Sequence, residues 1–294
     1  MIELFHTSSE SCSRQFTQRY STSFSSAIRL LHEDLRQPIY NIYGFVRLAD
    51  EIVDTFHHLD KPTLLANFKA ETYASIERGL SLNPILHSFQ LTVNQYNIDH
   101  ALIEAFFRSM EFDLSKRNYD EAGYKEYIYG SAEVVGLMCL YVFCEGDHSE
   151  YKKLEAPARS LGAAFQKVNF LRDIKADFNG LSRVYFPGCD FNNFTDADKR
   201  RIEADIQRDF DHAFTGIEAL PLKARFGVYV AYKYYLSLFR KIRRTEPKAI
   251  LDTRIRIANY HKALIVLRQI RDVSGADHRR EPTPRQSHRQ WVAG

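Results

Sequence analysis

Apolar residues recur at spacings of three and four from about residue 12 to residue 272, which is the period of an amphipathic helix. Alternating strand patterns bounded by turn residues are scarce, so the sequence predicts an all-α fold of many antiparallel helices. One helix is expected to begin at Pro38, because proline suits the first helical turn, and another to cover about 156–178. Further helices are predicted near the ranges 63–80, 82–96, 98–115, 122–145, 149–155, 196–218, 222–244 and 254–272.

Residues 273–294 break this pattern. They combine charged residues and two prolines with almost no apolar periodicity, a composition typical of disordered segments. We therefore interpret 1–272 as one helical domain and 273–294 as a disordered basic tail. Trp291, the only tryptophan of the chain, lies in this tail, and a contact with a membrane or a partner is a hypothesis for it.

The composition argues against several classes of protein. With 45% hydrophobic and 26% charged residues, the 294-residue chain has the balance of an ordinary soluble globule, and its net charge of +3 is too small to suggest nucleic acid binding. The four cysteines form no CxxC pair and no Cys/His metal spacing, which indicates reduced thiols in a cytoplasmic protein. The longest apolar stretch, 134–144, is too short to cross a bilayer, and no signal-peptide pattern opens the chain.

Two short acidic clusters share one shape, DEIVD at 50–54 and DIKAD at 173–177. Each places two aspartates four residues apart, so both carboxylates project from one face of a helix, at a cost of roughly 0.2–0.5 kcal/mol. Mg²⁺ prefers carboxylate oxygens, water and phosphate, and it commonly bridges carboxylates to substrate phosphates. Two solvated acidic helix faces are the alternative, but the repetition of the arrangement favours diphosphate chemistry.

Each aspartate pair belongs to a longer polar stripe on one helix face, whose members are three or four residues apart. If the two helices pack antiparallel with these faces inward, four carboxylates line one cavity. Two unit charges about 4 Å apart repel by about 4 kcal/mol at an effective dielectric of 20. Divalent cations would remove this repulsion and create a site for a polyanion. The stripes consist of Tyr43, Arg47, Asp50 and Asp54, and of Gln166, Asn169, Asp173 and Asp177.

Three further segments allow two interpretations each. The hydroxyl residues of YSTSF at 20–24 could cap a helix or donate to phosphate oxygens. In the helix predicted over 127–138, glycine costs about 1 kcal/mol relative to alanine, which close packing or room for an apolar ligand would offset. Arg183, in the loop after the second cluster, could reach phosphates near Asp173 and Asp177 or lie exposed on the surface.

Together these segments resemble the squalene/phytoene synthase family, the head-to-head prenyl synthases. The matching signatures are YGFVRLADEIVD at 43–54 and QKVNFLRDIKAD at 166–177, and the segments 20–24, 127–136 and 183–187 also fit in order. The likeness covers about residues 15–265 and is strongest to bacterial phytoene synthases. Glu133 departs from the family, which usually has glycine there, and the basic tail after Asp272 does not match.

The resemblance implies a single-domain isoprenoid-synthase-type helical bundle around a central cavity. It implies that two geranylgeranyl diphosphates condense to phytoene through a cyclopropyl diphosphate intermediate, as in carotenoid biosynthesis. Mg²⁺ is the implied cofactor, Mn²⁺ is the alternative ion, and NADPH is not expected. Squalene or dehydrosqualene synthesis from two farnesyl diphosphates is the alternative, because the sequence does not decide between C15 and C20 substrates. A non-catalytic helical assembly or binding protein is the alternative from another class.

The resemblance also assigns roles to individual residues. Release of a very apolar product makes peripheral contact with the inner face of the membrane a hypothesis. The implied metal ligands are Asp50, Asp54, Asp173 and Asp177. The implied diphosphate contacts are Ser21, Ser23, Arg47 and Arg183, with Tyr235 and Arg254 closing the site. The residues implied near the reacting carbons are Tyr43, Tyr129, Gln166 and Asn169.

Overall fold

The computed structural model describes residues 1–115, 118–181, 185–190 and 193–256, without the side chains of 176–181 and 252. The chain divides into two units, Met1–Ile257 and Ala258–Gly294, and the described residues all belong to the first. The predicted tail and most of the helix predicted over 254–272 therefore lie outside the described residues.

The described elements are helices, as predicted for an all-α fold. The described part contains no helix that is both long enough and apolar enough to cross a membrane. The helices are α1 (Ile2–Tyr20), α2 (Thr22–Ile28), α3 (Glu33–Asp54), α4 (Lys61–Arg78), α5 (Pro84–Tyr96), α6 (His100–Ser115), α7 (Glu121–Ile128), the π-helical turn η1 (Tyr129–Glu133), α8 (Val134–Phe143), α9 (His148–Leu181), α10 (Asp196–Ala219), α11 (Leu222–Arg243) and α12 (Pro247–Asp252).

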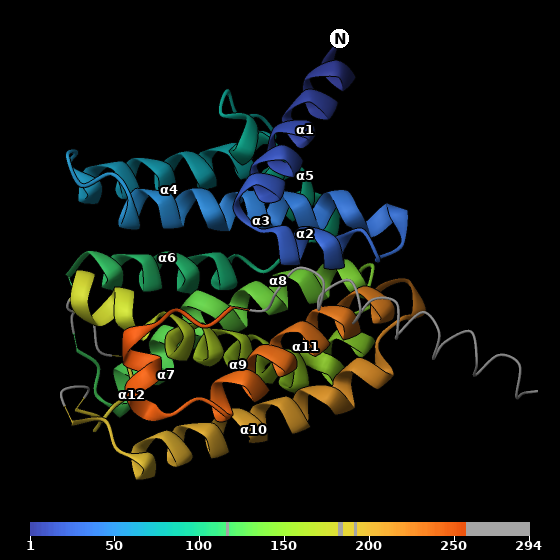
Figure 1. Ribbon diagram of the computed structural model, residues 1–294. Coiled ribbons are helices and arrows are strands. Elements are labelled where there is room, and N and C mark those ends of the chain that lie inside the picture. The colour runs from blue at the N-terminus through green and yellow to red at the C-terminus, as the bar shows by residue number, and fades with distance from the viewer. Residues whose placement is uncertain (116–117, 182–184, 191–192, 257–294) are drawn as a thin grey trace, which may run out of the picture. The chain divides into compact units, whose positions relative to one another are not determined.

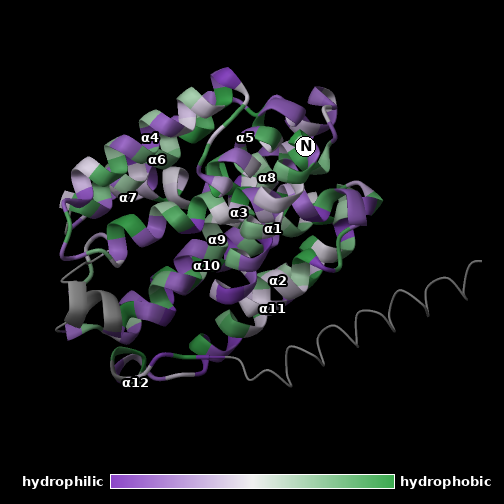
Figure 2. Cartoon of the chain, turned by 90° about the horizontal axis from the view of Figure 1, so that it is seen from above, coloured by the Kyte–Doolittle hydropathy of each residue, from purple (hydrophilic) through white to green (hydrophobic). Residues whose placement is uncertain are grey.

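The helices pack in layers around α6 and α8. In Figure 1, α3 and α4 lie on one side of α6 and α8, and α9, α10 and α11 lie on the other. α3 packs against α1, α5 and α8, whereas α9 packs against α8, α10 and η1. Hydrophilic and hydrophobic segments alternate along α4 and α10, as Figure 2 shows, because each buries only one face. On α10 the buried face consists of Ile202, Ile206, Phe210, Ala213 and Ile217.

An aromatic cluster anchors α3. Phe45 is fully buried, and its ring stacks on that of Phe89 with 3.8 Å between ring centroids. Phe106 and Phe107 of α6 contact the same ring at centroid distances of 5.3 and 5.6 Å. At about 100° per residue, Phe45 points roughly opposite to Arg47 and to the acidic cluster. The aromatic cluster therefore turns the polar stripe of α3 toward the centre of the bundle.

Two prolines lie inside helices and not at their starts. α3 begins at Glu33, so Pro38 lies inside the helix and not in its first turn. The acidic residues Glu33 and Asp34 favour this earlier start, because they stabilise the positive end of the helix dipole. α9 likewise runs without a break through Pro157, although two helices were predicted there. Gly216 of α10 leaves room for the proline ring, since a Cβ at Gly216 would stand 2.5 Å from the Cβ of Pro157.

The helix predicted over 122–145 is divided by the π-helical turn η1. Gly130 in this turn allows a close approach to α6, because a Cβ there would stand 2.5 Å from the carbonyl oxygen of Ala105. Of the two interpretations of small residues in this segment, close packing therefore holds at Gly130. The apolar stretch that follows forms α8, whose side chains are buried at Val134, Leu137, Met138, Leu140 and Val142.

We expect Gly130→Ala to lower the free energy of unfolding by about 1–3 kcal/mol, because the added methyl group has no space against a backbone oxygen. Urea denaturation followed by circular dichroism measures the loss. Gly136→Ala is the matched control, since its Cβ would meet Ala158 O at 3.3 Å and should cost less. An equal loss in both variants would contradict the close approach at Gly130.

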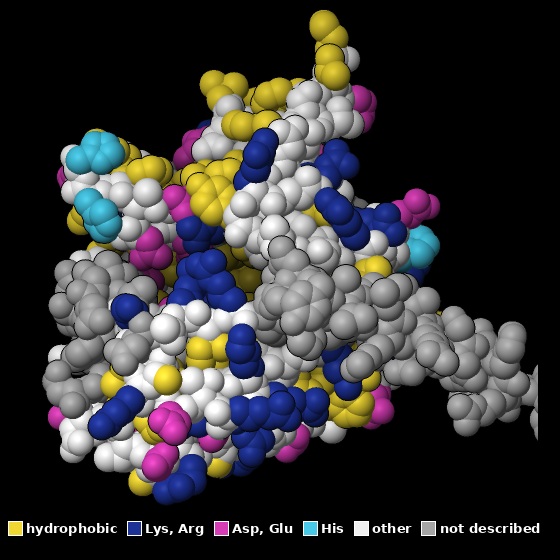
Figure 3. All heavy atoms as spheres, viewed as in Figure 1, with side chains coloured by type: hydrophobic (Ala, Val, Ile, Leu, Met, Phe, Trp, Pro, Cys, Tyr) yellow, Lys and Arg dark blue, Asp and Glu magenta, His cyan; other side chains and the backbone are white. Residues whose placement is uncertain are grey.

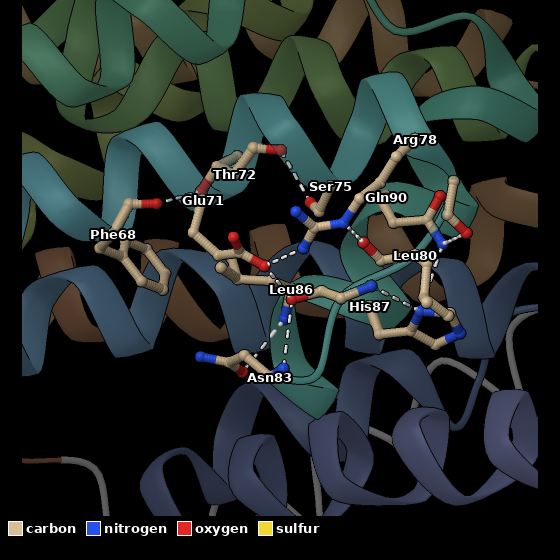
Figure 4. A network of polar contacts seen from close by, with 12 residues as sticks. Phe68, Glu71, Thr72, Ser75, Arg78, Leu80, Asn83, Leu86, His87 and Gln90 are labelled. Carbon is tan, nitrogen blue, oxygen red and sulfur yellow. Dashed lines mark hydrogen bonds and ion pairs between the residues drawn. The ribbon is translucent and has the colours of Figure 1, made fainter.

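Polar contacts fasten the corner between α4 and α5, which Figure 4 shows. Asn83 caps α5 by accepting hydrogen bonds from the backbone N–H groups of Ile85 and Leu86. The Nδ1 of the buried His87 accepts from the backbone N–H of Ser81 at 3.2 Å. Its Nε2 lies 2.8 Å from Nδ1 of His6, so the corner is also joined to α1.

Candidate active site

A cavity of about 590 Å³ lies between α2, α3, α6, α8, α9, α10 and α11. Its size falls in the range of small-molecule binding sites. Figure 3 shows a hollow with an apolar interior and Lys and Arg side chains at its rim. The predicted site residues in the cavity lining are Ser21, Tyr43, Arg47, Asp50, Asp54, Gln166, Asn169, Asp173, Tyr235 and Arg254.

The first acidic cluster lies at the end of α3, with Asp50 and Asp54 in the cavity wall. Burial raises the pKa of Asp50 to about 8, the guanidinium of Arg47 opposes this rise, and the carboxylates of Asp54 and Asp113 add to it. Arg47 Nη1 stands 3.6 Å from Asp50 Oδ2, and the same guanidinium pairs with Glu51. The ionised form of Asp50 is therefore disfavoured until a further positive charge enters the cavity.

The second acidic cluster lies on α9 and brings Asp173 to the same cavity. Its carboxylate is held by two guanidinium groups. Arg172 Nε stands 3.1 Å from both carboxylate oxygens, and Arg254 Nε stands 2.8 Å from Oδ1. The side chain of Asp177 and the whole of Arg183 lie outside the described residues. Three of the four predicted aspartates therefore converge on one cavity.

The two acidic helices present their carboxylates to the same cavity. In the described part of the chain, the main packing partners of α3 include α1, α5 and α8, and those of α9 include α8, α10 and η1. The cavity separates the two helices, so their carboxylates face each other across it. Both acidic helices pack against α8, which also lines the cavity.

Two amide residues of α9 lie next to Asp173 in the cavity wall. Gln166 donates weakly to Ser131 of η1 at 3.4 Å, and Asn169 lies one turn further along α9. Asn169 Oδ1 and Arg47 Nε are buried, and neither has a hydrogen-bond partner among the described residues. One hydrogen-bond acceptor and one hydrogen-bond donor in the cavity wall are thus unpaired. They fit a ligand that carries both a positive and a negative group.

Aromatic residues complete the wall near these polar groups. The ring of Tyr43 lies 5.1 Å from that of Phe24, and burial raises the pKa of Tyr43 to about 12, so its hydroxyl stays protonated. Tyr235 of α11 stacks on Phe165 of α9 with 3.8 Å between ring centroids. Arg47 lies 4.7 Å from the centre of the exposed ring of Tyr20.

Ser21 caps a helix, which is one of the two interpretations of the YSTSF segment. Its side-chain oxygen accepts from the backbone N–H of Phe24 at 3.2 Å, which caps α2. Ser21 also lines the cavity, and accepting this bond does not use its hydroxyl proton, so it retains the capacity to donate to an anion. Ser23 is not among the cavity-lining residues.

Tyr129 is not among the cavity-lining residues, although its neighbours Tyr127, Ser131 and Ala132 are. Its role near the reacting carbons stays a prediction. Its ring lies 5.1 Å from the guanidinium of Arg159. That arginine pairs with Glu133, the residue that departs from the family pattern, at 2.6 Å.

Sequence reasoning missed a further carboxylate in the wall. Asp113 of α6 is 6% exposed, and the hydroxyl of Tyr127 donates to its two oxygens at 3.0 Å each. Both residues line the cavity. Asp113 has no second aspartate four residues away, so its spacing gave no signal. Arg172 was missed as a separate site residue because it stands directly before Asp173.

Away from the charged end the lining is mainly apolar. Six of these side chains, from in and beside α2, α8, α9 and α10, are at most 5% exposed, whereas Arg254 at the charged end is 51% exposed. The cavity therefore has an open charged end and a closed apolar end. The apolar end includes Ile28, Leu31, Leu140, Leu154, Ile217 and Leu220.

The donor set fits a magnesium ion that is shared with a phosphate ligand. No three Asp, Glu, His or Cys side chains of the described residues come close enough together to hold an ion by themselves. Mg²⁺ usually needs one or two carboxylates and completes its shell with water and substrate phosphates. Asp50, Asp54 and Asp173 supply such carboxylates, and the orphaned oxygen of Asn169 is a further hard donor.

A helical bundle with carboxylates at the open end of a closed apolar cavity defines the class of helical prenyl-diphosphate enzymes. Residues 17–261 match the squalene/phytoene synthase family. The chain therefore belongs to the squalene/phytoene synthase family, whose members are prenyltransferases that join two prenyl diphosphates head to head.

Individual relatives agree with this assignment. The chain is 30% identical over 262 residues to a phytoene synthase of Arthrospira platensis, covering 79% of this chain and 83% of that protein. It is 28% identical to a phytoene synthase of Cereibacter sphaeroides, covering 79% and 71%. A 4,4'-diapophytoene synthase of Staphylococcus haemolyticus is 22% identical, with 79% and 86% covered.

Solved structures confirm the fold. A dehydrosqualene synthase superposes with a TM-score of 0.77 at 18% identity, covering 92% of this chain and 98% of that one. A squalene synthase of Alicyclobacillus acidocaldarius superposes with a TM-score of 0.71 at 22% identity, covering 83% and 95%. At these identities the likeness supports the architecture and not the substrate.

Proposed function

We propose that this protein condenses two geranylgeranyl diphosphates head to head into phytoene, through a cyclopropyl diphosphate intermediate. The observation that carries the proposal is the convergence of Asp50, Asp54 and Asp173 at the charged end of a cavity whose other end is apolar. A substrate with a diphosphate head and a long hydrocarbon tail matches both ends of this cavity. The similarity to two phytoene synthases supports the C20 substrate.

The charged end would hold the diphosphate heads. Bound Mg²⁺ would supply Lewis acidity toward the leaving diphosphate, and Asp50, Asp54 and Asp173, with Asp177, would hold it. Arg47, with its unpartnered Nε, and Arg254 can donate to phosphate oxygens. Arg254 would leave the carboxylate of Asp173 to do so. Ser21 would add a neutral donor, and Arg183 and Ser23 remain predicted contacts.

The wall beyond the charged end would stabilise the carbocations. In the first step the C–O bond of one substrate breaks, and diphosphate leaves with the electron pair. The double bond of the second substrate attacks the allylic cation, and loss of a proton closes the cyclopropane. The second diphosphate then leaves, and rearrangement and proton loss give phytoene. The faces of Tyr43 and Tyr235 and the amides of Gln166 and Asn169 border the space where these charges would form.

Two other functions are alternative candidates for this protein. The 22% identical relative is a 4,4'-diapophytoene synthase, which keeps a dehydrosqualene or squalene product from two farnesyl diphosphates as the second candidate. A non-catalytic binding protein is the candidate from another class, and the three converging carboxylates speak against it. We also propose a cytoplasmic protein with peripheral membrane contact, because a hydrocarbon product must leave into lipid.

Incubation of the purified protein with C15 and C20 prenyl diphosphates, with and without Mg²⁺ and NADPH, tests the function. We expect a C40 hydrocarbon from geranylgeranyl diphosphate that depends on Mg²⁺ and not on NADPH. Mn²⁺ is expected to replace Mg²⁺. A C30 product as the main product would assign the farnesyl alternative. No condensation product from either substrate would support the non-catalytic alternative.

A further inference from the structure

A basic surface lies beside the open end of the cavity. Between residues 233 and 256 the chain has eight Lys and Arg residues and two acidic ones. The formal net charge of the whole chain is only +3. The rest of the chain is therefore net negative. We call the basic surface the exposed side chains Arg240, Lys241, Arg243, Arg244, Lys248 and Arg256.

A buried face holds the basic surface in place. Leu236, Phe239 and Ile242 of α11 are at most 6% exposed. Beyond this helix, Ile250 and Ile255 are buried as well, at 0% and 6% exposure. The charges therefore stand on an anchored backbone and form a fixed array.

Carboxylates of the described residues do not neutralise this array. Within the described part of the chain, Arg240, Arg244 and Lys248 form no ion pair. Arg243 donates to the amide oxygen of Gln207 at 3.2 Å, and Lys241 donates to the backbone carbonyl of Arg256 at 2.7 Å. Hydrogen bonds to neutral oxygens leave the positive charge uncompensated, so the surface retains its charge toward an external partner.

Helix capping does not account for all of these charges. Cations in the last turn of α11, such as Arg240 and Arg243, are stabilised by the negative end of the helix dipole. Lys248, however, lies in the first turn of α12, where the dipole disfavours a cation, and Arg256 follows the helix altogether. A role in the fold therefore explains only part of the array.

The basic surface extends to the cavity. Arg254 lies between α12 and Arg256, lines the cavity and pairs with Asp173 at 2.8 Å. In Figure 3, Lys and Arg side chains stand at the rim of the hollow and gather below it, in the region where Figure 1 places α10 and α11. A planar anionic partner that covers the basic surface would thus face the open end of the cavity.

We propose that the basic surface docks this protein on an anionic lipid bilayer, with the open end of the cavity toward the membrane. Clusters of Lys and Arg bind the negative headgroups of such a surface. The inference rests on the proposed function in one respect, because that function supplies the apolar product that would pass from cavity to lipid. The charge distribution itself does not depend on the substrate.

Vesicle sedimentation of the full chain tests the proposal. We expect binding to vesicles of phosphatidylcholine mixed with phosphatidylglycerol and not to phosphatidylcholine alone. Binding should fall as salt rises from about 0.1 M to about 1 M, because the Debye length shrinks from about 10 Å to about 3 Å. The triple variant Arg240→Glu, Arg244→Glu and Lys248→Glu should bind at least about tenfold more weakly.

Two controls carry the same change in net charge. One reverses Arg279, Arg280 and Arg285 in the predicted tail, and the other reverses Lys125, Lys152 and Lys153 elsewhere on the fold. Both should keep most of the binding, and all variants should keep the circular dichroism spectrum of the parent chain. Equal weakening in all three would reduce the effect to net charge, and loss in the tail variant alone would move the site to the tail. Either result would overturn the proposal.

Further outcomes separate this proposal from its competitors. Equal binding to neutral vesicles, or tighter binding to duplex DNA than to anionic vesicles, would also overturn it. A fall in kcat/KM of the triple variant without vesicles would show that the surface steers diphosphates instead. Vesicle binding needs no substrate. A protein that binds vesicles but forms no hydrocarbon would therefore contradict the proposed function and still support the docking surface.

Discussion

Asp50→Asn is expected to abolish condensation while the protein stays folded. The substitution removes one carboxylate from the charged end of the cavity and with it a predicted Mg²⁺ ligand. A loss of about 4 kcal/mol of transition-state stabilisation corresponds to a fall in kcat of about 10³-fold. Turnover of radiolabelled geranylgeranyl diphosphate at saturating Mg²⁺ measures the loss.

The stability of this variant is expected to move in the opposite direction. Burial raises the pKa of Asp50 to about 8 in the folded state, so the folded protein holds this proton more tightly than the unfolded chain does. Without metal, Asp50 therefore destabilises the fold increasingly as pH rises from the unfolded pKa toward 8. The asparagine variant should gain more thermal stability at pH 9 than at pH 5.

A control variant separates the loss of one negative charge from the loss of the Asp50 carboxylate in the cavity. Glu77→Gln removes one negative charge from an exposed position on α4 and should change neither turnover nor the pH dependence of stability. If Asp50→Asn retained more than about a tenth of the parent activity, or lost stability at pH 9, the carboxylate would not have the assigned role.

Phe45→Ala is expected to cost about 3–5 kcal/mol of folding free energy, the largest stability effect we predict. The ring is fully buried and stacks on Phe89 at 3.8 Å, so its removal leaves a cavity between α3, α5 and α6. For a domain of this size the melting temperature should fall by roughly 6–12 °C. Differential scanning calorimetry measures the change.

Leu222→Ala, at a leucine that is 81% exposed, is the matched control and should change stability by at most about 0.5 kcal/mol. Activity per folded Phe45→Ala molecule should remain within a few-fold of the parent at low temperature, because the ring faces away from the cavity. Equal melting temperatures for the parent chain and Phe45→Ala would contradict the anchoring of α3 by this cluster.

The acidic clusters could be predicted because their signal is local. Two aspartates four residues apart share a helix face wherever the helix lies, and the same spacing in both clusters suggested a common target. The convergence of Asp50, Asp54 and Asp173 on one cavity confirms this part. The arrangement of the helices depends on contacts between distant segments, and the sequence did not indicate that both acidic helices pack against α8.

Other features depended on contacts between residues distant in the sequence. Asp113 is a site residue because Tyr127 bonds to it from another helix, and neither residue has a telling spacing. Pro38 was a poor boundary marker, and α9 continues through Pro157, since packing against neighbouring helices outweighed the loss of one backbone hydrogen bond at each proline.

The π-helical turn changes the direction in which the side chains of α8 point relative to those of α7. Tyr127 and Phe143 both line the cavity, yet in an unbroken α-helix side chains sixteen residues apart would point about 160° away from each other. The additional residue that a π-turn accommodates reduces this offset to about 60°. Deletion of one residue between Tyr129 and Glu133 would therefore rotate α8 about its own axis and turn its ligand-facing side into the packed interior.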